Sequence, residues 1–475
     1  MSAPAVSAES MAIALCADGA ARADAGDMTA AIERYQRAVD TAPTLLDLHL
    51  ILANAQHLRG DVLTARATLR RALKCAARPD VTSEFTLGKA LVDVGAGADA
   101  VPCFRRVHAE RPDDAAAASA LASALREAQQ PEKAWTGMQA ALRLAPTDPV
   151  VLFTAAMIRH DLADYAGAMR WCQRSLDLRP DAPGVTIFRG YLRHLLGDAA
   201  GGWHDFEARP RPRPDTAAAL WTGESLEGRS LLVIGEQGVG DQFQFLRFVQ
   251  HPMVQAASRV VISCQPDAVS LLRASGYTAV ARDTAVFTDF HVPLLSLPLV
   301  LGEGADWRGW GDAYLGAPGA APRTVSPVKR VGLVCAGNPA HRNDAARSMP
   351  SSILHVLRHS HPGLQFVDMQ HGVCDTEQRT AQWERAVCTD WNSTAESLRT
   401  LDLLITVDTG IAHLAGALGV PVWILLPLVP DWRWGASGNR TAWYPVARLF
   451  RQPTRGDWSR VVTNVSAALS AATLG

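Results

Sequence analysis

The first half of the chain repeats a pattern with a period of 34 residues, and this period restricts it to few architectures. Pro112, Pro146 and Pro180 are 34 residues apart, and Pro43 and Pro79 nearly keep that spacing. Small residues recur in one slot of each unit and bulkier ones, with Cys172 among them, recur four positions later: Ala31, Ala65, Ala100, Ala134, Ala168 and Tyr35, Leu69, Phe104, Met138, Cys172. So short a unit cannot bury an apolar face alone, and the units must therefore stack.

This pattern resembles the tetratricopeptide repeat, in which each unit is a pair of antiparallel helices packed closely through small residues. A turn residue recurs five positions before four of these small residues, at Gly26, Gly60, Gly95 and Ala163, and Gly197 occupies the same turn position of the next unit. We predict five repeats and a degenerate sixth over Gly197–Phe206, which caps an α-helical tetratricopeptide solenoid spanning residues 1–214. Its apolar slots are core positions. A protein or peptide that the sequence does not identify would bind its concave surface.

Three prolines that alternate with arginine end the repeat region at Pro210-Arg-Pro-Arg-Pro214, because proline disfavours helix at its own position and at the one before it. The remaining residues are enough for further domains with large cores. A net charge of −1 and a pI near 6.9 give no general attraction to nucleic acid or to an anionic membrane. We therefore predict that nucleic acid is not a partner.

The cysteines and the apolar runs indicate a cytoplasmic protein. The eight cysteines include no Cys-x-x-Cys pair, which is typical of reduced thiols in the cytosol. No Lys or Arg precedes the short apolar run Met11–Cys16, so a signal peptide is not expected. No apolar run approaches the roughly 18 residues that cross a membrane. We expect no transmembrane segment.

The segment Leu403–Leu426 is typical of a strand, a tight turn, a short helix and a second strand. Leu403–Val407 has the length and branched content of a buried parallel strand, and Val422–Leu426 resumes as a strand after Gly419 and Pro421. The helix between them carries a single apolar stripe, formed by Ile411, Leu414, Ala415 and Leu418.

The turn of this segment is a candidate anion site. Asp408, Thr409 and Gly410 connect the strand to the helix, where free N–H groups and the positive end of the helix dipole favour a negative ligand. His413 lies in the first turn of the helix and off its apolar stripe. We predict that these four residues bind the diphosphate of a nucleotide-linked substrate.

A glycine-rich turn follows the first strand after the repeats. The strand Ser230–Gly235 leads into this turn, and a helix over Phe243–Gln250 follows it. The spacing Gly235-x-x-Gly238-x-Gly240 differs from the dinucleotide fingerprint, and the next strand, Arg259–Cys264, ends without an acid for a ribose. These two features argue against NAD or FAD. Further strands are expected at Ala279–Ala281 and Phe287–Val292, before a loop rich in leucine and proline over Pro293–Gly302.

Asp241 directly follows the glycine turn, at the mouth of the strand. A carboxylate there can accept a proton from an attacking hydroxyl or amide as a general base. An ordinary helix cap accounts equally well for an aspartate at a helix start. The sequence leaves both roles open.

A second polar loop follows the strand Val331–Gly337. Gly337, Asn338, Arg347 and Ser348 combine backbone donors with positive charge, which suits a phosphate. A solvated basic loop is the alternative. The anion interpretation gains because the turn at residues 408–413 would lie on the same edge of the sheet.

Tryptophans alternate with arginine in the loop after the last of these strands. Trp432 and Trp434 flank Arg433, and such a loop either stacks on a base or sugar ring or covers the edge of the sheet. A structural role is favoured for Trp434. Trp432, Arg433, Gln237 and Gly240 remain candidate contacts to the base or the sugar.

Taken together, these motifs resemble those of a GT-B glycosyltransferase of the heptosyltransferase-like family nine and, more distantly, of the protein O-GlcNAc transferases. The motifs that carry the resemblance are Glu236-Gln-Gly-Val-Gly-Asp241, Gly337-Asn-Pro-Ala-His with Arg347-Ser-Met-Pro350, Asp408-Thr-Gly-Ile-Ala-His413 and Pro430-Asp-Trp-Arg-Trp434. The resemblance implies an α/β GT-B unit of two Rossmann-like domains: an acceptor-side domain over 215–323 and a nucleotide-sugar domain over 324–475.

The resemblance also implies roles for single residues. Asp241 matches the acid that serves as base in heptosyltransferases, and Thr409, Gly410 and His413 match the start of the diphosphate-binding helix. Arg347 falls where relatives place a basic residue, often lysine, against the diphosphate. Such enzymes work without a metal or a resident cofactor, and the chain has no Asp-x-Asp motif. We expect an inverting, metal-independent transferase whose repeats hold a protein acceptor, such as flagellin.

The motifs leave three alternatives to compare. The acceptor is a saccharide or lipid-linked glycan in the first, and the transferase half is a non-catalytic scaffold in the second. The third is an aspartic protease, suggested by Asp408-Thr-Gly. That chemistry needs two such carboxylates, and the motif occurs once, opening a helix after a parallel strand. The protease is therefore excluded.

Overall fold

The structure is a computed structural model that describes residues 7–75, 79–214, 216–302, 313–316, 329–371 and 384–473. Contacts between Cα atoms divide the chain into two compact units, Met1–Asp181 and Ala182–Gly475. The boundary expected between residues 323 and 324 lies outside the described residues.

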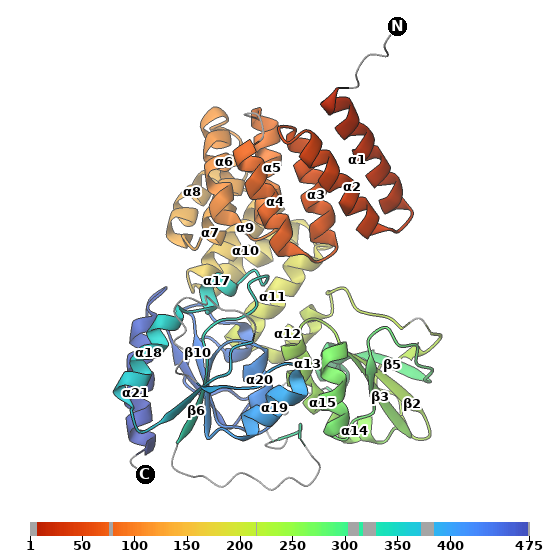
Figure 1. The fold of residues 1–475 in the computed structure, drawn as a ribbon, viewed down its shortest axis with the longest axis vertical. Coiled ribbons are helices and arrows are strands. Elements are labelled where there is room, and N and C mark those ends of the chain that lie inside the picture. Colours follow the sequence, from red (N-terminus) through yellow and green to blue (C-terminus); the bar gives the residue numbers. More distant parts are fainter. Residues whose placement is uncertain are drawn as a thin grey trace. The chain divides into compact units, whose positions relative to one another are not determined.

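The first unit consists of helices that pair with their neighbours in the chain (Figure 1). In chain order they are α1 (Ala8–Asp24), α2 (Met28–Thr41), α3 (Leu46–Leu58), α4 (Val62–Cys75), α5 (Val81–Asp93), α6 (Gly97–Glu110), α7 (Ala115–Glu127), α8 (Pro131–Leu144), α9 (Pro149–Asp161) and α10 (Tyr165–Leu178). Aspartates cap several of them by accepting backbone N–H groups, for example Asp27 on α2 and Asp80 on α5.

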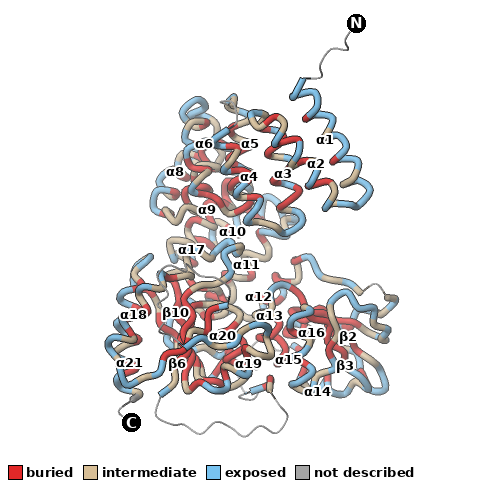
Figure 2. The backbone as a smooth tube through the Cα atoms, viewed as in Figure 1, coloured by how far each residue is buried: buried red, intermediate tan, exposed pale blue. Residues whose placement is uncertain are grey.

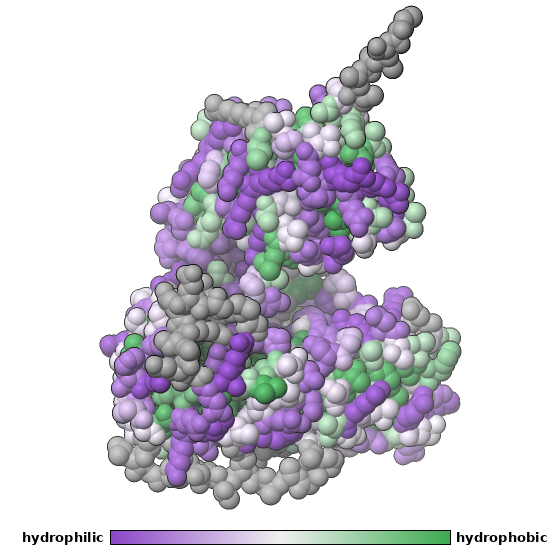
Figure 3. Space-filling view, viewed as in Figure 1, coloured by the Kyte–Doolittle hydropathy of each residue, from purple (hydrophilic) through white to green (hydrophobic). Residues whose placement is uncertain are grey.

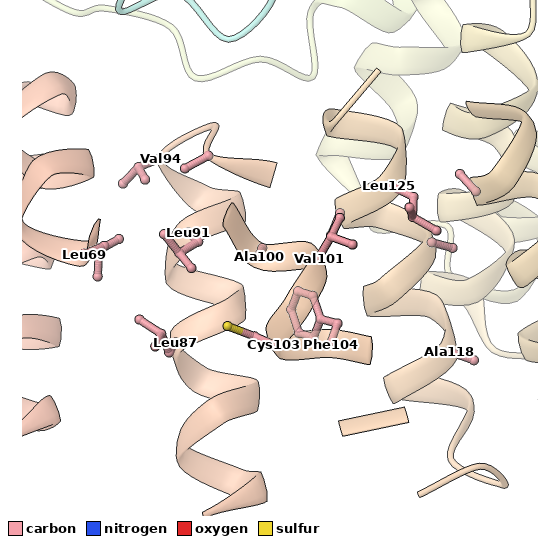
Figure 4. Packing of buried hydrophobic residues seen from close by; sticks show 14 of the residues in the cluster. Leu69, Leu87, Leu91, Val94, Ala100, Val101, Cys103, Phe104, Ala118 and Leu125 are labelled. Carbon is pink, nitrogen blue, oxygen red and sulfur yellow. The ribbon is translucent and has the colours of Figure 1, made fainter. Parts of the chain in front are cut away.

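The repeated slots form the core of this unit. Every small and every bulkier residue of the two slots is buried. Figure 4 shows how Ala100 and Phe104 on α6 pack among Leu87 and Leu91 of α5 and residues of α7. A Cβ on Gly88 would lie 2.7 Å from the Phe104 ring, so this close packing needs glycine. The predicted repeat packing is confirmed.

The backbone conformation at the turn position explains why glycine is common there. Gly26, Gly60 and Gly95 have φ of 84°, 87° and 72°, in the left-handed region that glycine adopts at low cost. Ala163 occupies the same slot with φ 59°, and Gln129, which the sequence pattern did not single out, occupies it with φ 60°. The turn is therefore set by the repeat geometry, and glycine is its preferred but not its obligatory residue.

The second unit begins with two further helices, α11 (Pro183–Leu196) and α12 (Ala199–Phe206). They are joined by a buried ion-pair cluster in which Asp205 accepts from Arg189 (2.7 Å from both Nε and Nη2) and pairs with Arg193 (2.9 Å). Both helices contact the α/β part of this unit.

The first sheet is wholly parallel, with the strand order β1-β5-β2-β3-β4. Its strands are β1 (Ala219–Leu220), β2 (Ser230–Ile234), β3 (Arg259–Cys264), β4 (Ala279–Ala281) and β5 (Phe290–Pro293). The connecting helices are α13 (Val239–Phe245), η1 (Leu246–Gln250), α14 (Pro252–Gln255), η2 (Pro266–Ala268), α15 (Val269–Ala274), η3 (Leu294–Ser296) and α16 (Leu297–Val300). The loop expected over Pro293–Gly302 was wrong, because it forms η3 and α16, with Pro298 tolerated in the first turn of α16.

The second sheet is also parallel, with the order β11-β10-β9-β6-β7-β8. Its strands are β6 (Arg330–Val334), β7 (Gln365–Asp368), β8 (Glu384–Arg385), β9 (Leu403–Val407), β10 (Val422–Leu426) and β11 (Ala447–Arg451). Its helices are α17 (Asp344–Arg347), α18 (Ser351–Ser360), α19 (Trp391–Arg399), α20 (Gly410–Ala417), η5 (Trp432–Trp434) and α21 (Trp458–Thr473).

Helices cover both faces of this second sheet (Figure 1). On one face Val331, Leu333 and Ile405 pack against apolar residues of α18 and α21. On the other face α20 contacts β9 and β10. The strands are therefore buried from both sides, as Figure 2 shows, which explains why β9 is a continuous apolar run.

The strand order of each sheet reverses beside its first central strand. In the second sheet β7 and β8 lie on one side of β6, and β9, β10 and β11 lie on the other. Loops that follow β6 and β9 therefore diverge and leave a crevice at the carboxyl ends of the strands, where ligands bind in open α/β sheets. The predicted fold class is confirmed: a helical tetratricopeptide array precedes two parallel sheets consistent with two Rossmann-like domains.

Candidate functional site

A cavity of about 680 Å³ lies where the carboxyl ends of the two sheets face each other within the second unit. This volume falls in the range of small-molecule and cofactor sites. Its lining comes from the turn after β2, the loops after β6 and β9, the start of α19 and the segment after β10: it includes Gly240, Asp241, Gly337, Asn338, Arg347, Asp408, Thr409, Gly410, His413 and Arg433. Ten of the residues predicted from sequence are thus brought together.

The start of α20 presents backbone donors to this cavity. The buried strand β9 ends at Val407. Asp408 follows it, and Thr409 occupies the N-cap position of α20. The Thr409 side chain makes no capping hydrogen bond; its hydroxyl lies 3.4 Å from that of Thr406. The Ala412 N–H is bonded to the Thr409 carbonyl (3.0 Å), so a ligand would meet the N–H groups that precede it, where the helix dipole favours an anion.

The loop after β6 adds positive charge. A Cβ on Gly337 would lie 2.6 Å from Arg347 Nη2, so the guanidinium rests directly on the main chain of this glycine. Ser348 does not line the cavity but accepts the Gly337 N–H (3.0 Å) and donates to Asp344 (2.9 Å). Asp344 also pairs with Arg347 (3.4 Å). Ser348 and Asp344 thus fix the loop that carries Gly337 and Arg347.

Asp241 is the acid that the first sheet contributes. Its Oδ2 accepts the Gly238 N–H at 3.0 Å, so it closes the first turn of α13. Burial raises the pKa of Asp241, and the neighbouring Arg433 opposes that rise. A raised pKa is typical of carboxyl groups that accept protons in enzymes, although structural acids also show it. Helix cap and cavity carboxylate are therefore combined in one residue.

Two glycines bring the sheets into contact beside Asp241. A Cβ on Gly240 would lie 3.0 Å from the His413 ring and 3.2 Å from Gly410 Cα. A Cβ on Gly410 would in turn meet Trp391 at 3.2 Å. The starts of α13 and α20 therefore approach each other main chain to main chain.

His413 is a neutral, fixed imidazole. Its Nδ1 lies 3.0 Å from the Tyr444 hydroxyl, and its ring stacks on Trp434 with centroids 5.2 Å apart. Burial lowers the pKa of His413 to about 3, and the charge of Arg433 contributes further. The imidazole therefore carries no charge at neutral pH, and it can meet a phosphate only as a neutral hydrogen-bonding group.

Asp408 stays protonated up to a weakly acidic pH, because its pKa is raised. Burial raises the pKa of Asp408 to about 6, and the nearby carboxylate of Asp431 adds to the rise. Arg347 and Arg433 act in the opposite direction. An anion bound at the start of α20 would raise it further, because like charges disfavour ionisation.

Arg433 lies between the two sheets. It follows β10 and belongs to the second sheet, where its Nη1 donates to Asp431 at 2.8 Å. Its Nε donates to Gln244 of α13 at 2.7 Å, and its Nη2 donates to Asp241. One guanidinium therefore contacts both halves of the cavity.

Besides Ser348, two further sequence candidates lie outside the cavity lining. Gln237 is exposed, adopts φ 56° and accepts a hydrogen bond from Gln265 through its carbonyl oxygen (3.1 Å). Trp432 is buried, with 7% of its surface exposed, and stacks on His194 with ring centroids 4.5 Å apart. Its partners belong to α11 and α12, because Tyr191 and Trp203 also contact it.

Sequence reasoning missed several residues that shape the site. Gln370 accepts the N–H groups of Cys335 (3.1 Å) and Ala336 (3.0 Å) and so holds the chain after β6. Trp391 donates its indole N–H to Asp267 (2.9 Å), a second link between the sheets. Asp431 alone had a sequence signal, since it stands within the motif 430–434.

Half-buried His194 and buried His413 make the stability of the second unit depend on pH in a way that can be measured. Burial lowers the pKa of His194 to about 4, below the ordinary value of 6.5 that the unfolded chain has. Neutral His194 therefore contributes fully to the free energy of unfolding above pH 6.5, and this contribution is lost as the pH falls toward 4. About 2 kcal/mol is lost by pH 5. His413 acts in the same direction, whereas the raised pKa values of Asp408 and Asp241 act oppositely.

Replacing His194 by asparagine is therefore expected to shrink the fall in stability between pH 7.5 and pH 5. Thermal melts across this range measure the difference, and His359→Asn, at an exposed position of α18, is the matched control. An unchanged pH dependence in His194→Asn would show that His194 does not carry this linkage.

None of the described helices is long and apolar enough to cross a membrane. The described cysteines are free thiols.

The fold and the site define a class: tetratricopeptide repeats followed by an α/β unit with a cavity between two parallel sheets. The tetratricopeptide repeat family model matches residues 17–81 and 85–149. Over 94% of its length the chain is 23% identical to protein FlbA of Caulobacter vibrioides, of which it covers 82%.

Solved structures resemble the repeats. One is a tetratricopeptide repeat protein from Parabacteroides merdae, 17% identical, with a TM-score of 0.33 over 41% of this chain and 77% of that one. Another is YrrB, described as a tetratricopeptide repeat protein with an unusual peptide-binding site, 16% identical, with a TM-score of 0.29 over 37% of this chain and 89% of that one.

Proposed function

We propose that this chain is a glycosyltransferase that moves a sugar from a nucleoside-diphosphate donor to an acceptor held by the repeats. The observation that carries the proposal is the composition of a single cavity. It combines a carboxylate of the first sheet, Asp241, with an anion-binding helix start and the cation Arg347 of the second sheet. Transfer from a phosphorylated sugar needs this pair of functions, a base for the acceptor and positive charge for the leaving group.

The donor diphosphate would bind at the start of α20. The N–H groups after Thr409 point from the positive end of the helix dipole, and Arg347 lies across the same cavity. As the bond to the sugar breaks, negative charge grows on the diphosphate, and these groups stabilise it electrostatically. The nucleobase of the donor would occupy the part of the cavity lined by Gln370, Cys388 and Thr394.

Asp241 would accept the proton of the attacking acceptor group. Because burial raises its pKa, it holds a proton more readily than an exposed aspartate does. Attack from the side opposite the diphosphate inverts the anomeric carbon, and no protein nucleophile is needed.

The acceptor would be a protein bound by the repeats. The three segments expected from sequence would have separate roles: residues 1–214 would bind the acceptor, residues 215–323 would supply the general base, and residues 324–475 would bind the donor. Free thiols at the described cysteines are consistent with a cytoplasmic reaction. A saccharide or lipid-linked acceptor would need the same base and the same anion site, so the cavity alone does not select between them.

The second candidate function is a scaffold that has lost catalysis. The repeats support it, because tetratricopeptide arrays bind proteins without any enzyme attached. Retention of Asp241, Arg347 and the open helix start in one cavity favours the enzyme.

A panel of nucleotide sugars and nucleoside diphosphates tests the proposal by thermal shift. A donor that binds only the folded protein stabilises it by about 2.7 kcal/mol at 100 times its dissociation constant, and the melting midpoint should rise by several degrees. The sugar-free nucleoside diphosphate should produce much of this shift, whereas the free sugar should produce none. A panel with no shift would contradict nucleotide binding and favour the scaffold.

A further inference from the structure

In this structure the proposed general base of the cavity, Asp241, is paired with the cation Arg433. Each guanidinium nitrogen has a partner: Nε donates to Gln244 (2.7 Å), Nη1 to Asp431 (2.8 Å) and Nη2 to Asp241. Only 10% of the Arg433 side chain is exposed. Two of these three partners belong to α13 of the first sheet, although Arg433 itself belongs to the second.

The main chain of Arg433 is held firmly by its own half of the unit. The Asp431 carboxylate accepts the Arg433 N–H at 3.0 Å, which closes the short helix η5. The guanidinium lies over the Trp432 ring, with Cζ 4.7 Å from the centroid, and that ring is buried among α11 and α12. The side chain is thus the part of Arg433 that can change partners while the backbone stays fixed.

Pairing with Arg433 makes Asp241 a weaker base than burial alone would leave it, because the cation opposes the rise in pKa that burial causes. A carboxylate next to a fixed cation loses affinity for protons. Of the two carboxylate oxygens, Oδ1 is taken by Arg433 and Oδ2 accepts the Gly238 N–H at 3.0 Å. An acceptor hydroxyl that approached Asp241 in this arrangement would find neither oxygen unengaged.

The cavity itself supplies the competitor that can displace this contact. Arg433 and Asp241 both line it, together with the start of α20 and Arg347. A diphosphate placed there carries at least two negative charges, against one for Asp241. Arginine binds phosphate oxygens through paired, charge-assisted hydrogen bonds, so the guanidinium would gain by turning to the ligand.

We propose that Arg433 couples donor binding to catalysis: it covers Asp241 while the cavity is empty and turns to the diphosphate when the donor binds, which frees Asp241 to act as base. This inference rests on the proposed function. In the reaction the acceptor hydroxyl gives its proton to Asp241 and its oxygen bonds to the anomeric carbon. The bond from that carbon to the diphosphate breaks, and its electron pair leaves on the diphosphate beside Arg433.

The exchange gives the enzyme an order of events. Without donor, Arg433 and the Gly238 N–H engage both carboxylate oxygens of Asp241, so an acceptor or water must compete with them for the base. With donor, the same movement uncovers the base and adds a cation to the leaving group. A single side chain therefore serves both ends of the transfer.

A structure of the full chain with a nucleoside diphosphate tests the exchange directly. The probe is uridine diphosphate or adenosine diphosphate, whichever raises the melting midpoint more. We expect an Arg433 nitrogen within about 3 Å of a phosphate oxygen and no contact from Arg433 to Asp241. A bound diphosphate beside an intact contact between Arg433 and Asp241 would overturn the inference and leave the proposed function standing.

Calorimetry with the same diphosphate provides the solution test. Arg433→Met should weaken binding at least about tenfold, and Arg433→Lys, which keeps the charge, should weaken it by no more than about threefold. Arg440→Met is the matched control, because Arg440 is exposed in the same loop and does not line the cavity; its affinity should equal that of the unmodified chain. Unchanged binding by Arg433→Met would also overturn the inference. If neither diphosphate binds the unmodified chain, the proposed function fails first, and this inference with it.

Discussion

Replacing Asp241 by asparagine is expected to reduce sugar transfer by about 10²- to 10⁴-fold, the range typical for loss of a general base. Asparagine keeps the size of the side chain and leaves an oxygen for the Gly238 N–H, so α13 should still begin at the same residue. Donor binding should persist, because the anion site lies on the second sheet. Transfer assays with a donor identified by thermal shift, together with calorimetry of donor binding, measure the two effects separately.

The matched control for this variant is Asp283→Asn, at an exposed position of the same half that does not line the cavity. It should transfer sugar at the unmodified rate. Full activity of Asp241→Asn would remove Asp241 from the reaction, and the carboxylate would then be a helix cap alone. Loss of donor binding in this variant would mean instead that Asp241 organises the cavity.

Replacing Arg347 by alanine is expected to weaken donor binding about 10- to 100-fold. A hydrogen bond to a charged group contributes about 1.5–3 kcal/mol, and Arg347 would also lose its electrostatic attraction to the diphosphate. The side chain is 14% exposed and lies against Gly337, so its charge is only partly screened by water. Calorimetry with the nucleoside diphosphate measures the loss without any acceptor.

Arg460→Ala serves as the control for this second variant, since Arg460 is exposed on α21 and does not line the cavity. Arg347→Lys should recover much of the affinity if charge dominates, and little if two parallel hydrogen bonds do. Equal affinity in Arg347→Ala and the unmodified chain would place the diphosphate elsewhere in the cavity.

Local patterns made much of the fold predictable. The repeat slots were recoverable because each unit obeys the same packing rule, so five weak signals reinforce one another. β3, β4, β9 and β10 were predicted with the residues they have, because each is an apolar run ended by turn residues or glycine and proline. The helix over residues 297–300 was not predicted, because a run of leucines around a proline shows no helical period. Proline is nevertheless well tolerated in a first helical turn.

From the sequence, the candidate site was predictable as loops at strand ends, two of them on one edge of a sheet, but not as one cavity shared by two sheets. Each sequence motif marks the end of one strand, and the parallel sheet then gathers the loops at one edge, which is why the residues after β6 and β9 line one cavity. Contacts across the sheets leave no such trace: Arg433 and Asp241 are 192 positions apart. Trp432 illustrates the same limit, since its burial depends on Tyr191 and Trp203, which no local pattern connects to it.

The surface of the described repeats is largely hydrophilic on the face seen in Figure 3, with scattered apolar side chains. Single exposed apolar residues such as Leu58 and Leu73 are normal for a protein surface.

In the proposed transferase, the main-chain contact between Gly240 and Gly410 would limit where selectivity between donors can arise. Because neither residue has a side chain to trim or enlarge, the distance between the sheets at this point is set by the backbone and cannot be tuned in small steps. Room for a larger or smaller sugar or base must therefore be made on the other walls, where Met369, Cys388 and Thr394 offer side chains of adjustable size. Relatives with different donors should accordingly keep the two glycines and differ at those three positions.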